Sequence, residues 1–145
     1  MKVLVQRVKE ASVSVDGSII GQINRGLLVF LGINQGDNEA ICEKMLQKVL
    51  AYRMFSDDEG RMNLNVQQVE GELLIVSQFT LVANTNKGLR PSFSSAGSPD
   101  KSRELYEKFI SLAKKTSVSV SVGQFGADMQ VSLINDGPVT FMLEL

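Results

Sequence analysis

The sequence predicts an α/β fold: a single domain over residues 1–145 with three layers of helices, sheet and sheet, in the order β-β-β-α-β-α-β-β-β. A length of 145 residues fits one domain, and a hydrophobic fraction of 43% is enough to form its core. Two stretches have apolar residues at helical spacing, whereas most others alternate as strands do. Because two helices cover only one face of a sheet, a second layer of sheet is expected.

The first 31 residues are predicted to form three strands. Residues 3–8 are a strand, and valines alternate with serines over residues 12–15 before the turn pair Asp16-Gly17. This pattern predicts a hairpin that returns over residues 19–23. Residues 27–31 are apolar on both faces, as expected of a central strand that other layers cover on each side.

Two helices are predicted from start signals and apolar stripes. Asp37 is expected to cap the first helix, and Ser98-Pro99-Asp100 combines a cap, a proline for the first turn and an acid near the positive end of the helix dipole. The apolar stripe of the first helix consists of Ile41, Met45, Val49 and Tyr52, with Leu46 and Leu50 beside it. The stripe of the second helix consists of Leu105, Phe109 and Leu112.

The remaining segments are predicted to be strands and one long loop. Residues 72–81 form a strand between the helices, and three further strands close the chain at residues 118–122, 129–133 and 139–143. Residues 84–98 are rich in Asn, Gly, Ser and Pro, which predicts an extended surface loop. Loops of this length are often functional.

Composition excludes several classes of function. Fifteen basic and sixteen acidic side chains leave a net charge of −1, which argues against a protein that coats nucleic acid through many phosphate contacts. The absence of histidine removes the usual general base and the commonest metal ligand. Cys42 stands alone within a helical pattern and is predicted to be a small buried side chain. Neither a signal peptide nor a membrane-spanning run is present, so a cytosolic protein is expected.

Common signatures of cofactor and metal sites are missing from the sequence. It contains neither G-x-G-x-x-G nor G-x-x-x-x-G-K-[ST], and it has no Cys/His set with metal-binding spacing. Asp57-Asp58-Glu59-Gly60 lacks the spacing of a calcium loop and is predicted to be a solvated turn. We therefore predict no metal and no cofactor.

Two segments are candidates for a functional site. Ser77-Gln78-Phe79-Thr80 places polar groups where the buried strand leaves the core, a position at which a scaffold fixes side chains and free backbone N–H groups. The alternative is an ordinary strand edge. In the second segment, Asp136-Gly137 is typical of a tight hairpin turn, whereas Pro138 removes one backbone donor. Sequence leaves two possibilities here, a cis peptide or a trans proline that opens an edge strand.

These two segments, extended to Leu81 and to Asn135 and Thr140, resemble the signature motifs of the D-aminoacyl-tRNA deacylase family. The likeness extends to most of the chain. It includes Gln6-Arg7-Val8, Ala11-Ser12-Val13, residues 52–57, residues 62–68, Arg90-Pro91-Ser92-Phe93 and residues 127–133. The resemblance implies a cytosolic homodimer that hydrolyses the ester joining a D-amino acid, or achiral glycine, to the terminal adenosine of tRNA. It implies the tRNA acceptor end as partner, and neither DNA nor a membrane.

The resemblance also implies roles for the two signature segments. Ser77, Gln78, Phe79 and Thr80 correspond to the catalytic segment, with backbone N–H groups near the ester oxygen. Thr80 is a candidate nucleophile, but no histidine accompanies it, so we prefer attack by water assisted by the ribose 2′-hydroxyl of the tRNA. Gly137 and Pro138 correspond to a cis Gly-Pro pair that enters the pocket of the other subunit as a chirality filter, and Arg7 corresponds to the arginine that supports this loop.

Four further residues are implied to bind the substrate. Phe125 and Met129 are expected to line the adenosine pocket, with strand-core packing as their alternative role. Lys87 and Arg90 are expected to meet phosphates near the acceptor end. Gly126 stands where alanine is more usual in the family, which could loosen the segment around Phe125.

Two rival functions come from other classes. The first is a non-catalytic, dimeric protein that binds RNA ends, against which the intact signature segments count. The second is a serine hydrolase that uses Ser77 on small esters. The sequence has neither the G-x-S-x-G motif of such enzymes nor a histidine to complete a triad, which counts against this hypothesis.

Overall fold

Strand β1 (Lys2–Val15) organises the fold because it pairs along both of its edges. In the computed structural model, which describes residues 1–86 and 88–145, β8 (Gln130–Glu144) lies antiparallel along one edge of β1. The other edge pairs first with β3 (Gly26–Gly32) and then with β2 (Ser18–Ile23). One strand thereby connects two layers of sheet.

The central part of the sheet is mixed. Its strands lie in the order β2-β1-β3-β6-β7, where β6 is Glu72–Ser77 and β7 is Val120–Val122. The pairs β3–β6 and β6–β7 are parallel, whereas β1 is antiparallel to its neighbours. β4 (Phe55–Ser56) and β5 (Met62–Leu64) form a separate small hairpin.

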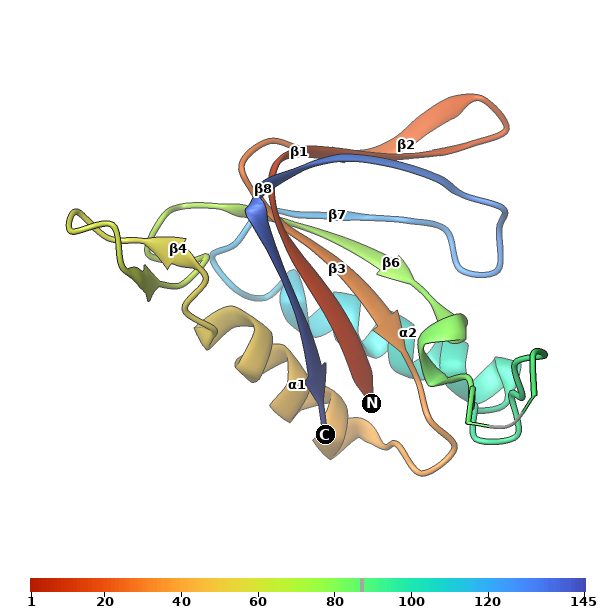
Figure 1. The fold of residues 1–145 in the computed structure, drawn as a ribbon. Helices are drawn as coiled ribbons and strands as arrows, with labels where there is room; N and C mark the ends of the chain where they lie inside the picture. Colours follow the sequence, from red (N-terminus) through yellow and green to blue (C-terminus); the bar gives the residue numbers. More distant parts are fainter. Residues whose placement is uncertain (87) are drawn as a thin grey trace.

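Apolar side chains fill both faces of β3. Leu27, Val29 and Leu31 point into the larger core, which lies between the sheet and the helices α1 (Glu39–Ala51) and α2 (Pro99–Ala113). Both helices lie on the same side of the sheet (Figure 1). Leu28 points the other way, into a smaller core beneath the second half of β1. Each side chain buried in this way contributes about 1.5–3 kcal/mol to stability.

The bend of β1 creates this second core. The register of β1 against β8 shifts between Gln6 and Val8 and again between Val8 and Glu10. Beyond these irregularities β1, β2 and the start of β8 fold over β3 and β6, since Val13 and Ile23 pack with Leu74 in the smaller core. The Ser121 hydroxyl donates to the carbonyl of Gln22 at 2.9 Å and so links β7 to β2.

The C-terminal strands differ from the prediction. Residues 129–133 and 139–143 were expected to be two strands joined by a hairpin turn at Asp136-Gly137, but β8 is one strand that continues along β1. The prediction of strand 72–81 was too long, because β6 ends at Ser77 and the 3₁₀ helix η1 (Phe79–Val82) follows it. The short hairpin of β4 and β5 was not predicted.

The helix starts were predicted with one error. Asn38, not Asp37, caps α1, and its side-chain oxygen accepts from the backbone N–H of Ile41 at 3.0 Å. Tyr52 lies just after the end of α1 rather than within it. Pro99 begins α2 as predicted, although the Ser98 side chain makes no capping hydrogen bond.

Asp37 instead binds the N-terminus of the chain. Its Oδ1 accepts from the ammonium of Met1 at 2.7 Å, and its Oδ2 accepts from the backbone N–H of Asn34 at 2.7 Å. The same ammonium donates to the carbonyl of Leu145 at 2.7 Å, so the two ends of the chain lie side by side (Figure 1). Asp37 is buried, with 4% of its surface exposed. A buried charge pair of this kind depends on both partners.

Cys42 is fully buried in α1, as predicted. Its thiol donates to the carbonyl of Leu105 in α2 at 3.6 Å, and burial raises the pKa of this thiol to about 11. The side chain therefore packs between the helices as a protonated thiol. Of the helices in the described residues, none is long and apolar enough to cross a membrane.

Replacing Asp37 by alanine is expected to lower the free energy of unfolding by about 3–5 kcal/mol, because the Met1 ammonium would stay buried without its counter-charge. Urea denaturation followed by circular dichroism measures this change. Asp58→Ala, in the exposed turn between β4 and β5, is the matched control and should change stability by less than about 0.5 kcal/mol. Equal stability of the two variants would contradict the role given to the ion pair.

Candidate active site

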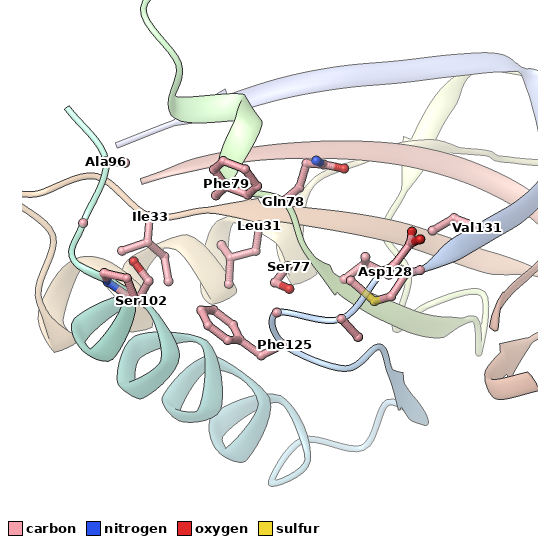
Figure 2. Close-up of a pocket in the computed structure, with 16 residues that line it drawn as sticks. Leu31, Ile33, Ser77, Gln78, Phe79, Ala96, Ser102, Phe125, Asp128 and Val131 are labelled. Atoms are coloured by element: carbon pink, nitrogen blue, oxygen red, sulfur yellow. The ribbon is translucent and has the colours of Figure 1, made fainter. Parts of the chain in front are cut away.

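A cavity opens where β6 and β7 separate. Their pairing ends at Ile75 and Val122, and the backbone N–H of Gly123 still donates to the Ile75 carbonyl at 2.9 Å. Beyond this point the segments that follow β6 and β7 diverge around a cavity of about 420 Å³ (Figure 2). Its volume lies in the range of small-molecule sites.

The buried Tyr106 holds α2 against the point of divergence. Its hydroxyl donates to the carbonyl of Ile75 at 3.0 Å, and its ring lies 5.6 Å from the ring of Phe125, centroid to centroid. Burial raises the pKa of Tyr106 to about 12, so the hydroxyl stays protonated and serves as a donor. Tyr106 thereby fixes β6 at Ile75, two residues before Ser77, where that strand reaches the cavity.

Ser77, Gln78 and Phe79 line one wall of the cavity. The backbone N–H of Gln78 donates to the Leu31 carbonyl at 2.8 Å, which extends the β3–β6 contact by one bond. The chain then turns into η1, whose first N–H groups have no acceptor within the helix. The N–H groups of Phe79 and Thr80 are therefore available at the end of β6.

Thr80 lies beside the cavity but does not line it. Its side chain is exposed, and Thr80 Oγ1 accepts from the side-chain amide of Gln78 at 2.6 Å. An amide N–H is a donor and cannot remove a proton from the hydroxyl. The structure thus places Thr80 next to a hydrogen-bond donor rather than a base.

Phe125 and Met129 form part of the opposite wall, on the connection from β7 to β8. Figure 2 shows Phe125 on the α2 side of the cavity and Phe79 on the η1 side. Met129 Sδ accepts from the backbone N–H of Gln124 at 3.3 Å and covers Gly123, where a Cβ would approach it to 2.7 Å. Both side chains are half-buried. Phe125 also packs against the larger core and Met129 against the smaller one, so each combines cavity lining with core packing.

Gly126 has a backbone conformation that explains its identity. Its φ is +77°, which L side chains rarely adopt, and no atom lies within 4 Å of the position of a Cβ. The residue therefore serves the turn between Phe125 and Met129 at the cavity wall.

Sequence reasoning missed the wall supplied by the start of α2. Ala96, Gly97, Pro99 and Ser102 line the cavity beside Ile33. The pattern Ser98-Pro99-Asp100 identified a helix start, but only the topology shows that this start lies beside the end of β6. Among the described residues, no group of three or more His, Cys, Asp or Glu side chains is placed to hold a metal ion.

Gly137 and Pro138 lie outside this cavity, in an interruption of the β1–β8 ladder. Val8 pairs with Asn135 and Gln6 pairs with Thr140, so residues 136–139 of β8 face the single residue Arg7. The Gly137-Pro138 peptide is cis, and both residues are exposed. The four residues form a short bulged loop within β8, in which Gly137 and Pro138 are exposed and Val139 is buried.

Side chains replace the missing ladder bonds of this loop. Asn135 Oδ1 accepts from the backbone N–H of Val139 at 2.9 Å. Arg7 Nε donates to the carbonyl of Asp136 at 2.9 Å, and Arg7 Nη1 donates to the carbonyl of Met54 at 2.7 Å. The Arg7 side chain is largely buried, with 12% of its surface exposed. Arg7 therefore fixes the loop to the segment before β4.

The structure describes one of the two predicted phosphate contacts. Arg90 is exposed in the loop before α2 and does not line the cavity. Lys87 lies outside the described residues.

Comparison with a family model and with similar sequences identifies the family. The model of the family described as D-Tyr-tRNA(Tyr) deacylase matches residues 4–144. Proteins named D-aminoacyl-tRNA deacylase from Shewanella pealeana (57% identity) and Saccharophagus degradans (59%) match over 145 residues, which is 100% of each chain.

Solved structures are similar over the same length. One described as c-Myc DNA Unwinding Element Binding Protein has a TM-score of 0.94 at 41% identity and covers 100% of this chain and 99% of its own. Another, a probable eukaryotic D-amino acid tRNA deacylase, has a TM-score of 0.83 at 17% identity, with 99% and 98% covered. The second supports the fold alone.

Arg7→Leu is expected to loosen the loop over residues 136–139, because two backbone carbonyls lose a charged donor, each such bond being worth about 1.5–3 kcal/mol. The free energy of unfolding should fall by at least that amount, and the amide of Val139 should exchange its hydrogen faster. Arg61→Leu, in the exposed turn after β4, is the control. Unchanged exchange at Val139 would show that Asn135 alone holds the loop.

Proposed function

The chain belongs to the D-Tyr-tRNA(Tyr) deacylase family and is a hydrolase, and we propose that it cleaves the ester joining a D-amino acid, or glycine, to the terminal adenosine of tRNA. The observation that carries this proposal is the cavity at the end of β6. Ser77, Gln78 and Phe79, which belong to a segment that resembles a signature motif of the family, line its wall. We further propose that the protein acts as a cytoplasmic homodimer without a cofactor or a membrane partner.

The cavity suits the terminal adenosine. Phe125 offers an aromatic face for the base, and Met129 adds an adaptable apolar surface. Arg103 lies over the Phe125 ring, with its Cζ 5.0 Å from the ring centroid, and limits the movement of that ring. The aminoacyl ester then faces residues 77–79 on the other wall.

Backbone groups carry the hydrolytic step in this proposal. The N–H groups of Phe79 and Thr80 would donate to the ester oxygen as it gains negative charge, an effect often worth about 10²–10³ in rate per donor. No imidazole exists in the chain, and the nearest partner of the Thr80 hydroxyl is the donating amide of Gln78. Water is therefore the nucleophile, and the 2′-hydroxyl of the terminal ribose assists it.

Gly137 and Pro138 are the proposed chirality filter, acting in the cavity of a second subunit. Their main-chain carbonyls would accept from the α-ammonium that all aminoacyl groups share and leave no space for a side chain in the L direction. Glycine passes because it has no side chain. The buried guanidinium of Arg7 supports the rigidity that such exclusion requires.

The proposed phosphate contacts are Lys87 and Arg90, in the long loop before α2. Few such contacts are needed for one RNA end, in line with the net charge of −1.

A second candidate function is DNA binding, because a similar solved structure is described as a DNA unwinding element binding protein. The balanced charge favours RNA-end recognition over extended phosphate contact. Fluorescence anisotropy with duplex and single-stranded DNA at physiological salt separates the two: submicromolar binding to DNA would support the second candidate.

Release of D-tyrosine from D-tyrosyl-tRNA should be fast, and release of L-tyrosine from the matched L-tyrosyl-tRNA should not exceed the uncatalysed rate. The reason is that the filter excludes the L side chain by a steric clash. Acid-precipitable counts from labelled tyrosine measure both rates. If neither ester is cleaved, the protein is an RNA-end binder, and if both are cleaved equally, the Gly137-Pro138 filter is wrong.

Thr80→Ala should retain kcat/KM on D-tyrosyl-tRNA within about tenfold, because the backbone N–H of residue 80 survives the substitution while the hydroxyl is lost. Single-turnover assays compare the rate of hydrolysis by Thr80→Ala with that of a control, Thr85→Ala. Thr85 is an exposed threonine of the neighbouring loop. A trapped covalent acyl group on Thr80, detected by mass spectrometry, would overturn attack by water.

A further inference from the structure

Two exposed aromatic rings form a pair at the rim of the cavity. Phe79 and Phe93 lie with their ring centroids 5.0 Å apart and their planes tilted by 46°. Phe79 is 63% exposed although it lines the cavity, and Phe93 is 38% exposed and lies outside the lining. The pair therefore extends the wall of the cavity outward onto the surface.

Backbone hydrogen bonds hold the pair in place. Asn84 and Ser92 exchange both backbone bonds, at 2.7 and 3.0 Å, which joins the segment before Phe93 to the end of η1. The Ser95 hydroxyl donates to the carbonyl of Val82 at 2.8 Å, and the N–H of Ala96 donates to the carbonyl of Phe93 at 3.0 Å. Phe93 thus belongs to a turn that is fixed against the same short helix that carries Phe79.

Burial does not account for these two rings. Single exposed apolar residues are common, but two aromatic rings in contact at the mouth of a cavity form an exposed apolar patch that water solvates poorly. Unpaired nucleobases stack on such surfaces, and every base has a suitable face. A net charge of −1 argues against many phosphate contacts, so base contacts would add to the affinity for an RNA end.

We propose that Phe79 and Phe93 stack the base of the nucleotide that precedes the terminal adenosine. This inference rests on the proposed function, since it needs the adenosine in the cavity between Phe79 and Phe125. Phe79 belongs to both the cavity and the pair, so the chain of nucleotides passes from one to the other without a gap. The two rings bind a nucleobase of the single-stranded acceptor end and take no part in the chemical step, to which Phe79 contributes only its backbone N–H.

The test compares two substrates that share the ester. One is 3′-O-D-tyrosyl adenosine, which ends at the cavity, and the other is a D-tyrosyl trinucleotide of sequence CCA. Phe93→Ala should raise KM for the trinucleotide by about 5- to 100-fold, the loss typical of one stacked base, with kcat unchanged. It should leave both constants unchanged for the adenosine substrate. Phe93→Trp should restore the trinucleotide KM, and Leu89→Ala, a fully exposed apolar residue of the same loop, is the control.

A trinucleotide with an abasic residue before the terminal adenosine completes the experiment. Wild-type protein should lose as much affinity on this substrate as Phe93→Ala loses on the normal one, and the two losses should not add. The inference would be overturned if Phe93→Ala lost equal affinity for the adenosine and the trinucleotide substrates, or if its loss and that of the abasic substrate were additive. A changed subunit stoichiometry of Phe93→Ala in sedimentation would also overturn it. Failure of the wild type to cleave either D-tyrosyl ester would instead overturn the proposed function.

Discussion

The antiparallel ladder between β1 and β8 is the interaction on which the rest of the structure depends. It runs from Lys2 paired with Glu144 to Ser14 paired with Gln130. At one end the Met1 ammonium closes the chain onto Asp37 and Leu145, and at the other end β8 brings Val131 to the wall of the cavity. The interruption opposite Arg7 lies between these ends. One strand therefore carries both a cavity wall and the exposed loop, and their separation along it is set by backbone pairing.

Because the chain has no histidine, the proposed hydrolytic step depends on backbone geometry at the site. In the cavity wall, the free N–H groups of Phe79 and Thr80 exist because η1 begins where β6 ends. Gln78 is bonded to β3 through its N–H, and Tyr106 is bonded to β6 through the Ile75 carbonyl. These bonds orient the donors before any substrate arrives, which is the condition under which hydrogen bonds stabilise a developing charge most.

Local sequence signals predicted what local interactions decide. The start of α2 at Pro99 and the burial of Cys42 depend on a few neighbouring residues, and both were correct. Asp37 and Asn38 are equally suitable caps by type, and the choice between them was made by the Met1 ammonium, 36 residues away. Asp136-Gly137 carries a hairpin signal, but pairing with β1 keeps β8 continuous through it. The cavity joins four distant segments, and the wall from the start of α2 was missed because no local signal links Pro99 to the end of β6.

The position of Gly137 and Pro138 places a condition on any role in selecting the substrate. Arg7 ties the loop to the Met54 carbonyl, and none of the residues 136–139 lines the cavity of the same chain. Since these residues do not line their own cavity, a role in selecting the substrate would have to be exercised at the cavity of another molecule. The proposed filter therefore requires a second copy of the chain, and a subunit alone would hold the ester and its backbone donors without the means to reject an L side chain. In this proposal hydrolysis and chiral selection are separable, because the backbone donors belong to η1 whereas Gly137 and Pro138 belong to β8.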